Sequence, residues 1–207
     1  MSNNNIESIL ALFSKQQFNE ALDAIQELIA NDPNDALLFN IQGACYAGLN
    51  KLNLAKDNYI KAITLNPDYA KAHYNLAGAL YELNEFDDSI QSYQNALAIE
   101  SDYAEAHNNL GNVFKAKGQL DLAIKSYGTA IDLKPDYIES HYSLGASFYE
   151  SGKLKETVKC YERVLEFRPK FTEIHNNLGN VLKELGRLDD AVLSYKTAIS
   201  IDPNFVE

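Results

Sequence analysis

The four histidines of this chain would be zinc ligands if their side chains met in space. They recur at intervals of 34 residues, as His73, His107, His141 and His175. Ligands to one zinc ion lie about 2 Å from it, whereas helices packed side by side have axes about 10 Å apart. A row of residues on successive helices therefore cannot converge on one metal. We interpret these histidines as half-buried packing residues and predict that the chain holds neither a metal nor another cofactor.

Catalytic motifs are missing from the sequence. It contains no phosphate-binding glycine loop, HExxH zinc motif, nucleophile elbow or calcium loop. Paired carboxylates such as Asp87-Asp88 stand at the starts of predicted helices, where negative charge is favourable for the helix dipole. Cys45 and Cys160 are too far apart in the repeats to form a disulfide, and we expect both to be buried as small hydrophobes. We therefore predict that this chain is not an enzyme.

The elements that position these residues follow the same interval of 34 residues. It is marked by a proline, or once by a serine, at Pro33, Pro67, Ser101, Pro135, Pro169 and Pro203. Within residues 104–137, apolar residues at three- and four-residue spacing predict a first helix, ended by Gly118 in the left-handed conformation. A second apolar stripe predicts a second helix, which Pro135 stops. Each unit therefore reads as a pair of helices.

Further rows of residues keep this register. The residues expected to end the first helices are Asn50, Asn84, Gly118, Gly152 and Gly186. Small residues that would let the paired helices approach are Gly43, Ala77, Gly111, Gly145 and Gly179, and the second helices supply Tyr59, Tyr93, Tyr127, Tyr161 and Tyr195. An Asp followed three residues later by Glu, as at Asp136 and Glu139 or Asp102 and Glu105, predicts a capping box at the start of a first helix.

A fixed repeat of 34 residues that forms two helices resembles the tetratricopeptide repeat, over essentially the whole chain. The resemblance implies an all-α fold, a TPR α-solenoid in which antiparallel helix pairs stack into a right-handed superhelix. We expect residues 1–207 to form a single array. Its units are a degenerate repeat at 2–35, five clear repeats at 36–69, 70–103, 104–137, 138–171 and 172–205, and the start of a further repeat at 204–207.

In this family the first helices line a concave groove that binds an extended peptide or a partner helix. Carrying that pattern onto this chain predicts that its groove contains Lys71, Tyr74, Asn75, Tyr81, Asn108, Asn109, Asn112, Lys115, Tyr142, Tyr149, Asn176, Asn177, Asn180 and Lys183. The same faces carry Glu82, Glu105, Ala146, Glu150, Glu173 and Glu184. The resemblance therefore implies a protein-interaction scaffold.

The asparagines of this groove form a row that could hold a peptide backbone. An Asn side chain offers both an acceptor and a donor, so it can pair with the C=O and N–H groups of any sequence. The repeats are similar in this respect to those of O-linked N-acetylglucosamine transferases, although Ile41 and Ser143 interrupt the row. The alternative interpretation is a solvated helix face for the asparagines and ordinary helix packing for the tyrosines.

A second binding mode of the family, the carboxylate clamp for the C-terminal tails of heat-shock chaperones, does not fit. That clamp needs a set of Lys, Arg and Asn residues on three successive first helices. At the matching positions this chain keeps only Lys71, with Ile6, Leu10 and Ile41 at three others. We therefore do not expect a receptor for chaperone tails.

The composition restricts the kind of partner. The chain is 46% apolar and 23% charged, with a formal net charge of −11, which is typical of a folded protein. A strongly acidic balance disfavours nucleic acids and anionic membranes as partners. No secretory signal begins the sequence and no apolar run is long enough to span a bilayer. We expect a cytoplasmic protein whose partners are proteins or peptides.

The C-terminal edge of the array is expected to be bare. Val192, Tyr195 and Ile199 would face water in part, whereas arrays usually end in a polar cap. We favour the explanation that the array continues in a longer chain, and the alternative is self-association through this edge. Arrays of this style often precede a catalytic domain, so the alternative function is a substrate-recruiting arm of a larger enzyme of the glycosyltransferase or sulfotransferase type.

Overall fold

The computed structural model describes residues 3–204, and within that range it contains twelve α-helices and no strand. The helices form an α-solenoid, because each one packs mainly on its neighbours in the sequence. The chain divides into two compact units, which within the described range are residues 3–102 and 103–204. The C-terminal part of the predicted further repeat, residues 205–207, lies outside the described residues.

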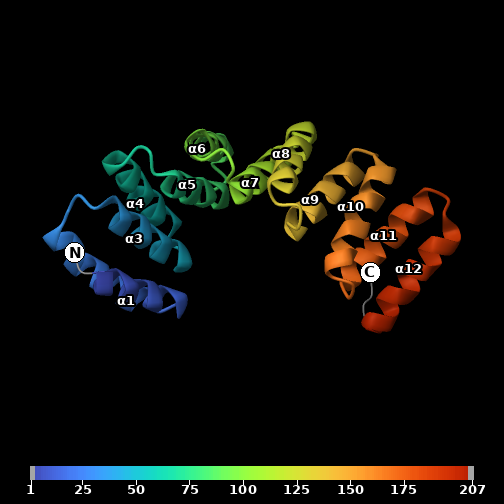
Figure 1. Ribbon diagram of the computed structural model, residues 1–207, viewed down its shortest axis with the longest axis horizontal. Coiled ribbons are helices and arrows are strands. Elements are labelled where there is room, and N and C mark those ends of the chain that lie inside the picture. Colours follow the sequence, from blue (N-terminus) through green and yellow to red (C-terminus); the bar gives the residue numbers. More distant parts are fainter. Residues whose placement is uncertain (1–2, 205–207) are drawn as a thin grey trace. The chain divides into compact units, whose positions relative to one another are not determined.

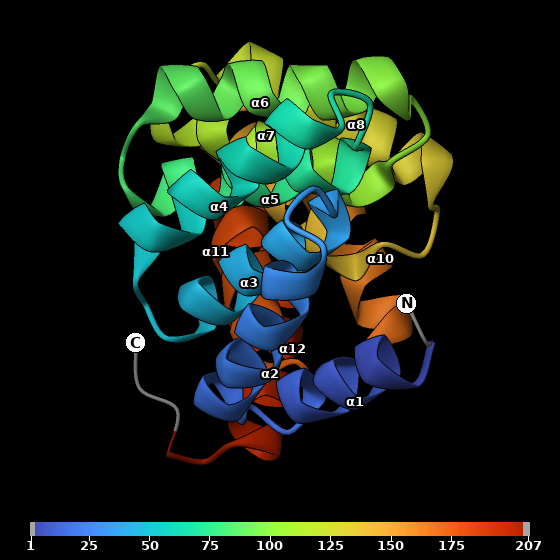
Figure 2. The ribbon, with the colours of Figure 1, turned by 90° about the vertical axis from the view of Figure 1, so that its left-hand side faces the viewer.

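The first unit contains six helices, coloured blue to green in Figure 1 and Figure 2. Their bounds are α1 Asn3–Ser14, α2 Phe18–Asn31, α3 Ala36–Gly48, α4 Leu52–Leu65, α5 Ala70–Glu82 and α6 Phe86–Ile99. Each helix contacts the next, and the first helices α3 and α5 of successive repeats also touch. Ile9 of α1, Ile25 of α2 and Leu38 of α3 meet in one buried cluster.

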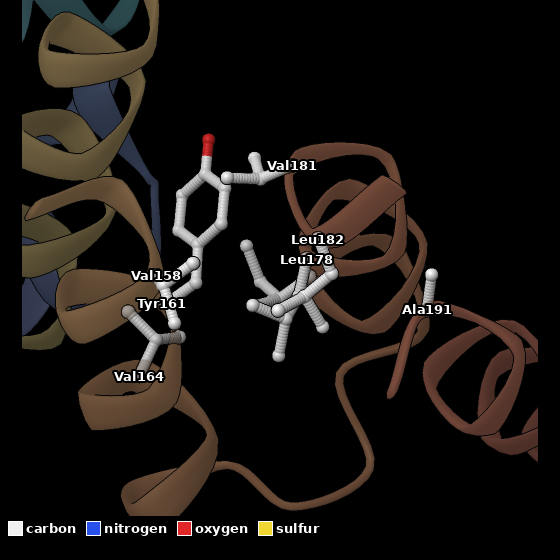
Figure 3. Packing of buried hydrophobic residues seen from close by; sticks show 8 residues of the cluster. Val158, Tyr161, Val164, Leu178, Val181, Leu182 and Ala191 are labelled. Carbon is white, nitrogen blue, oxygen red and sulfur yellow. The ribbon is translucent and has the colours of Figure 1, made fainter. Parts of the chain in front are cut away.

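The second unit contains the other six helices, which run from green to red in Figure 1. Their bounds are α7 Ala104–Ala116, α8 Leu120–Leu133, α9 Ile138–Glu150, α10 Leu154–Phe167, α11 Thr172–Glu184 and α12 Leu188–Ile201. Consecutive helices pack on each other, and α7 also contacts α9. Figure 3 shows a core cluster of this unit, in which Val164 and Tyr161 of α10 face Leu178 and Val181 of α11.

The predicted ends of the first helices are confirmed. Asn50 and Asn84 have φ of 56° and 61°, and Gly118, Gly152 and Gly186 have φ between 70° and 75°. This left-handed conformation stops a helix and turns the chain toward the next one. The same position of the degenerate first repeat holds Gln16, with φ of 59°. The turn is therefore kept even where the residue type is unfavourable.

The small residues of the first helices do lie against the tyrosines of the second helices. A Cβ atom added to Gly111 would lie 2.6 Å from Cε1 of Tyr127, and one added to Gly179 would lie 2.5 Å from Cε1 of Tyr195. Such distances are far inside van der Waals contact. The glycine and the aromatic ring therefore act together, because each ring occupies the space that the missing side chain leaves.

The capping-box prediction is wrong. Helices α7 and α9 begin one residue later than the box requires, so that Tyr103 and Tyr137 are the N-cap residues and neither makes a side-chain cap bond. The carboxylate of Glu139 instead accepts a hydrogen bond from Arg168 at 3.2 Å. An ion pair to the end of the second helix of the same repeat replaces the local cap. Among the described helices, α3 does have a side-chain cap, because the carboxylate of Asp35 accepts a hydrogen bond from the N–H of Leu37.

Three of the four histidines have the packing role predicted for them. The Nε2 atoms of His73, His141 and His175 lie 2.9 to 3.0 Å from the carbonyl oxygen of the proline six residues earlier. Each of these imidazoles therefore ties its helix to the loop before it. Since every one has its own backbone partner, the proline row and the histidine row belong to the same local structure.

The last helix keeps an exposed apolar face, as predicted. Val192 of α12 is 49% exposed, whereas its equivalent Val158, on which α11 packs, is 5% exposed. Ile199 is 58% exposed. Within the described residues no helix combines the length and apolar character needed to cross a membrane.

Candidate functional site

A pocket of about 280 Å³ lies on the faces of the first helices in the second unit. It is lined by Lys115 of α7, by Tyr142, Ala146, Tyr149 and Glu150 of α9, by Tyr161 of α10 and by Asn177, Asn180 and Val181 of α11. The structure thus brings together five of the residues predicted for the groove. They come from three successive repeats, so that no single helix pair could form this pocket.

The aromatic wall of the pocket is built around Tyr142. Its ring stacks on Tyr161 and on Phe171, with centroid distances of 6.4 Å in both cases. Its hydroxyl donates a hydrogen bond of 2.8 Å to Glu173. The two ring contacts and the hydrogen bond at the polar tip hold this ring in one orientation, and the half-buried side chain still lines the pocket.

Tyr149 is the more accessible ring of the wall, with 39% of its surface exposed. Its hydroxyl donates a hydrogen bond to Glu184. That bond is the main cause that raises the pKa of Tyr149. On the other side of the pocket, Nζ of Lys115 forms an ion pair of 2.9 Å with Glu150. The wall therefore combines an open aromatic face with charged groups at its edge.

The asparagines of the predicted row have different environments. The side-chain oxygens of Asn112 and Asn180 each accept a hydrogen bond of 2.8 Å, from Tyr127 and Tyr195 of the paired second helices. These bonds orient the two amides, and the NH2 group of Asn112 then donates to Asn109 at 3.5 Å. Asn177 differs from both. Within the part of the chain that the structure describes, its side chain has no hydrogen-bond partner and it lines the pocket.

Asn108 is not a groove residue, and this part of the prediction is corrected. Its side chain is only 5% exposed, and its oxygen accepts a hydrogen bond of 2.8 Å from the buried hydroxyl of Ser140. Its amide donates to Asn109 at 3.1 Å. Asn108 therefore connects the first helices α7 and α9. Asn109 also lies 3.5 Å from the amide of Asn112, so the polar groups of α7 bind one another.

The groove residues predicted in the first unit lie together on α5. Nζ of Lys71 lies 4.7 Å from the ring centroid of Tyr74, a cation–π contact, and Asn75 donates a hydrogen bond of 2.9 Å to Asn40. Tyr81 packs on Phe86 at a centroid distance of 5.8 Å. In the second unit, Asn176 is half-buried on α11 and Lys183 is exposed on the same helix.

Three residues of these surfaces were not predicted, and one of them is Val181 of α11, which lines the pocket. Tyr161 belongs to a second helix and was assigned only to packing, yet it lines the pocket. Asn40 was missed as well, although it joins Tyr69 and Asn75 by hydrogen bonds of 3.2 and 2.9 Å. It occupies the same repeat position as Asn108, which is the signal that could have revealed it.

Neither cysteine of the chain is an activated nucleophile. Burial raises the pKa of both Cys45 and Cys160 to about 11, so that each thiol stays protonated at neutral pH and is a poor nucleophile. Within residues 3–204 no group of His, Cys, Asp or Glu side chains is arranged to hold a metal ion. Aromatic rings, amides and carboxylates around an open pocket can recognise a ligand without changing it covalently.

Known repeat families account for most of the chain. The family described as "TPR repeat" matches residues 43–83, 77–118, 111–152 and 145–186, and "Tetratricopeptide repeat" matches residues 172–205. The chain belongs to the tetratricopeptide-repeat family. The helix pairs, the left-handed turns and the glycine–tyrosine contacts are therefore those of TPR units.

Solved structures similar to this TPR chain cover most of it. MamA is 29% identical, with a TM-score of 0.72 over 77% of this chain and 94% of that chain. YrrB, described as a TPR protein with an unusual peptide-binding site, has a TM-score of 0.76 over 88% of this chain and 94% of that chain. Since YrrB is only 21% identical, its likeness shows the fold alone.

Curated relatives match shorter segments of the TPR chain. The peroxisomal targeting signal receptor of Candida albicans is 34% identical over 64 residues, which are 31% of this chain and 11% of that protein. The STIP1 homolog of Dictyostelium discoideum is 32% identical over 79 residues, which are 38% of this chain and 14% of that protein. The matched segments thus cover about an eighth of the length of these relatives.

Proposed function

We propose that this TPR chain is a scaffold that binds an extended segment of another protein along its first helices. The observation that carries the proposal is Asn177, whose amide lines the pocket and has no hydrogen-bond partner among the described residues. An amide of this kind can pair with both the C=O and the N–H of a peptide backbone. The rings of Tyr142 and Tyr149 beside it supply rigid contact area for a side chain.

The relatives support this proposal. The Candida albicans protein is by its name a receptor for a targeting signal, and a segment of this chain is similar to it. The net charge of −11 disfavours nucleic acids and anionic membranes as partners. The likeness of the asparagine row to that of O-linked N-acetylglucosamine transferases belongs to this proposal too, as does a cytoplasmic location. We further propose that the chain itself is not an enzyme, because its pocket groups suit binding.

The alternative function is recruitment of substrates for a catalytic domain in a longer protein. It is supported by the curated relatives, in which the matched repeats are a small part of the whole length. A glycosyltransferase or sulfotransferase domain in the reading frame of the source gene would favour this alternative. Its absence there would leave the scaffold function.

The scaffold function is tested by the substitution Asn177→Ala. The probe is a library of short random-sequence peptides, from which binders to the wild-type chain are selected and their affinities measured. We expect Asn177→Ala to weaken these affinities by about tenfold, the effect of losing one or two neutral hydrogen bonds. The helix content should not change, because the side chain of Asn177 makes no hydrogen bond within the described residues.

The matched control is Asn53→Ala, which removes an exposed amide from the second helix α4. It should leave the affinities unchanged. Equal affinities for Asn177→Ala and the wild type would contradict the use of this amide. Failure to select any peptide would contradict the scaffold function in this unit.

Self-association is a separate proposal that rests on the exposed face of α12. Leu193 is 66% exposed, and its equivalent position in the other clear repeats holds the polar residues Asp57, Gln91, Lys125 and Lys159. Inside the second unit, the equivalent of the face around Val192 is covered by a first helix. Since every repeat of this chain contains a first helix, we propose that a first helix of a second copy covers the exposed face of α12.

Light scattering over a range of concentrations tests this proposal. The wild-type chain should increase in apparent mass as its concentration rises, and Val192→Lys should reduce that increase because it places a charge in the apolar face. The control Lys125→Gln changes an exposed residue of α8. A wild-type chain that stays monomeric at every concentration would refute self-association.

A further inference from the structure

We propose that the pocket between α7, α9 and α11 holds a positively charged side chain of the bound peptide, with arginine preferred over lysine. The inference rests on the proposed function, because it assigns a residue class to the peptide that Asn177 would hold. The observations behind it are the charges and the aromatic rings around the pocket.

The charges around the pocket are unbalanced. Three glutamates and one lysine either line it or bind a tyrosine that lines it, namely Glu150, Glu173, Glu184 and Lys115. Lys115 is paired with Glu150 at 2.9 Å. Glu173 and Glu184 accept hydrogen bonds from Tyr142 and Tyr149, and no described lysine or arginine pairs with either carboxylate. Two negative charges therefore stay uncompensated beside the pocket.

The tyrosine that donates to Glu184 is also the ring that a cation can reach. Both Tyr142 and Tyr149 line the pocket, but Tyr142 is half-buried and stacks on Tyr161 and Phe171, whereas Tyr149 is 39% exposed. A phenol that donates a hydrogen bond to a carboxylate carries more electron density in its ring, and this strengthens its attraction for a cation on the ring face. A cation on Tyr149 would therefore be held by the ring and by the carboxylate of Glu184 at its tip.

The ionisation of the tyrosines agrees with a negative potential at this place. Burial is the main cause that raises the pKa of Tyr161, and the charge of Glu173 contributes in the same direction. The bond to Glu184 raises the pKa of Tyr149. Only the part of these pKa shifts that comes from the charges of Glu173 and Glu184 reflects negative charge beside the pocket, and such charge favours a cationic side chain over an acidic one.

Arginine fits the pocket better than lysine. Its planar guanidinium can stack on the ring of Tyr149 and still donate in-plane hydrogen bonds to Glu184. A lysine ammonium is a compact, strongly hydrated charge and gains less from a ring. The volume of about 280 Å³ accommodates one long side chain rather than a folded segment.

A set of four synthetic peptides tests the inference. Each has the same short neutral sequence with a fluorescent label and differs only at one central residue, which is Arg, Lys, Leu or Glu. Fluorescence anisotropy at low salt measures the dissociation constants. We expect the Arg peptide to bind more tightly than the Lys peptide, the Leu peptide to follow, and the Glu peptide to bind at least tenfold more weakly than the Arg peptide.

Two substitutions with opposite expected effects identify the pocket as the place of binding. Glu184→Gln should reduce the preference for Arg over Leu several-fold, since it removes the uncompensated charge. Lys115→Met should increase that preference several-fold, because it removes the repelling cation and leaves Glu150 unpaired. The control Glu162→Gln removes an exposed carboxylate from α10 and should change the preference by less than twofold.

The outcomes separate this inference from the function on which it rests. Tight binding of all four peptides without a charge preference would overturn the inference and keep the scaffold function. An Arg preference that neither Glu184→Gln nor Lys115→Met alters would also overturn it, because the cation would then bind elsewhere. If none of the four peptides binds while library-selected peptides do, the cationic pocket is refuted. If no peptide of either kind binds, both proposals fail.

Discussion

At the scale of single residues, the same amino acid has different roles according to its partner. Asn108, Asn112 and Asn177 all lie on first helices, but the first is buried against Ser140, the second accepts from Tyr127, and the third has no partner among the described residues. Glycines differ in the same way. Gly111 faces the ring of Tyr127, whereas a Cβ atom on Gly128 would meet nothing within 4 Å.

The two glycines predict opposite effects of the same substitution. Gly111→Ala should lower the free energy of unfolding by about 1–3 kcal/mol, because the new Cβ would overlap the ring of Tyr127. Gly128→Ala should raise it by about 0.5–1 kcal/mol, since alanine is the better residue inside a helix. Urea unfolding followed by circular dichroism measures both. A loss of stability for both variants would show that α8 tolerates no added side chain.

At the scale of elements, successive first helices are joined by polar as well as apolar contacts. In the second unit, the hydrogen bond from Ser140 of α9 to Asn108 of α7 is buried, and Ser140 itself is fully inaccessible. Its distance of 2.8 Å and its surroundings make it a strong link for a neutral pair. This bond fixes the register of the two helices that contribute Lys115 and Tyr149 to the pocket.

Removing this link should destabilise the second unit. Ser140→Ala leaves the side-chain oxygen of Asn108 without its buried donor, so we expect a loss of about 1–3 kcal/mol in the free energy of unfolding. Denaturant titration gives the value, and Ser200→Ala on the exposed part of α12 is the control. An unchanged unfolding midpoint would mean that a water molecule or Asn109 replaces the lost donor.

At the scale of the whole molecule, both the exposed surfaces and the buried core result from the repeated packing of helices on their neighbours. Each helix buries one face on its neighbours, so an exposed apolar face is found on the last described helix, α12. The pocket needs side chains from three successive repeats. Buried ionisable groups are distributed as well, with Cys45 in the first unit and Cys160 in the second.

This distribution predicts a loss of stability in alkali. Burial raises the pKa of Cys45 and Cys160 from 9.0 to about 11. Between these two values the unfolded chain releases thiol protons that the folded chain retains. The stabilisation is therefore fully present below pH 9 and is lost as the pH rises toward 11, by on the order of 1–3 kcal/mol for each thiol.

Unfolding free energies at pH 8 and pH 10.5 test this expectation. The comparison is between the wild-type chain and the double variant Cys45→Ala, Cys160→Ala, because lysines and tyrosines titrate in both proteins. The wild-type chain should lose more stability than the variant over this interval. Equal losses would show that the thiols are not the groups responsible.

How much of the fold could be predicted depends on how local its cause is. The left-handed turns at Asn50 and Gly118 and the positions of the small residues and tyrosines were predicted, because they follow from residue type and a fixed period. The contact of each glycine with the tyrosine ring of the paired helix was not predicted. The capping boxes were predicted wrongly, because α9 begins one residue later than a box at Asp136 requires. The partner that Glu139 has instead, Arg168 just after α10, lies 29 residues away in the sequence and could not be found from local spacing.

The sequence by itself determined the repeat, the helix pairs and the set of residues from which a binding surface is drawn. Only the tertiary structure decided which of them are available to a ligand. The hydroxyls that donate hydrogen bonds to Asn112 and Asn108 belong to residues 15 and 32 positions away in the sequence. Tyr161 lines the pocket from a second helix. A hydrogen bond requires two groups within about 3 Å, so the packing of neighbouring helices decides which asparagines bond inside the fold. It engages Asn108 in a buried hydrogen bond and leaves the amide of Asn177 available to a ligand.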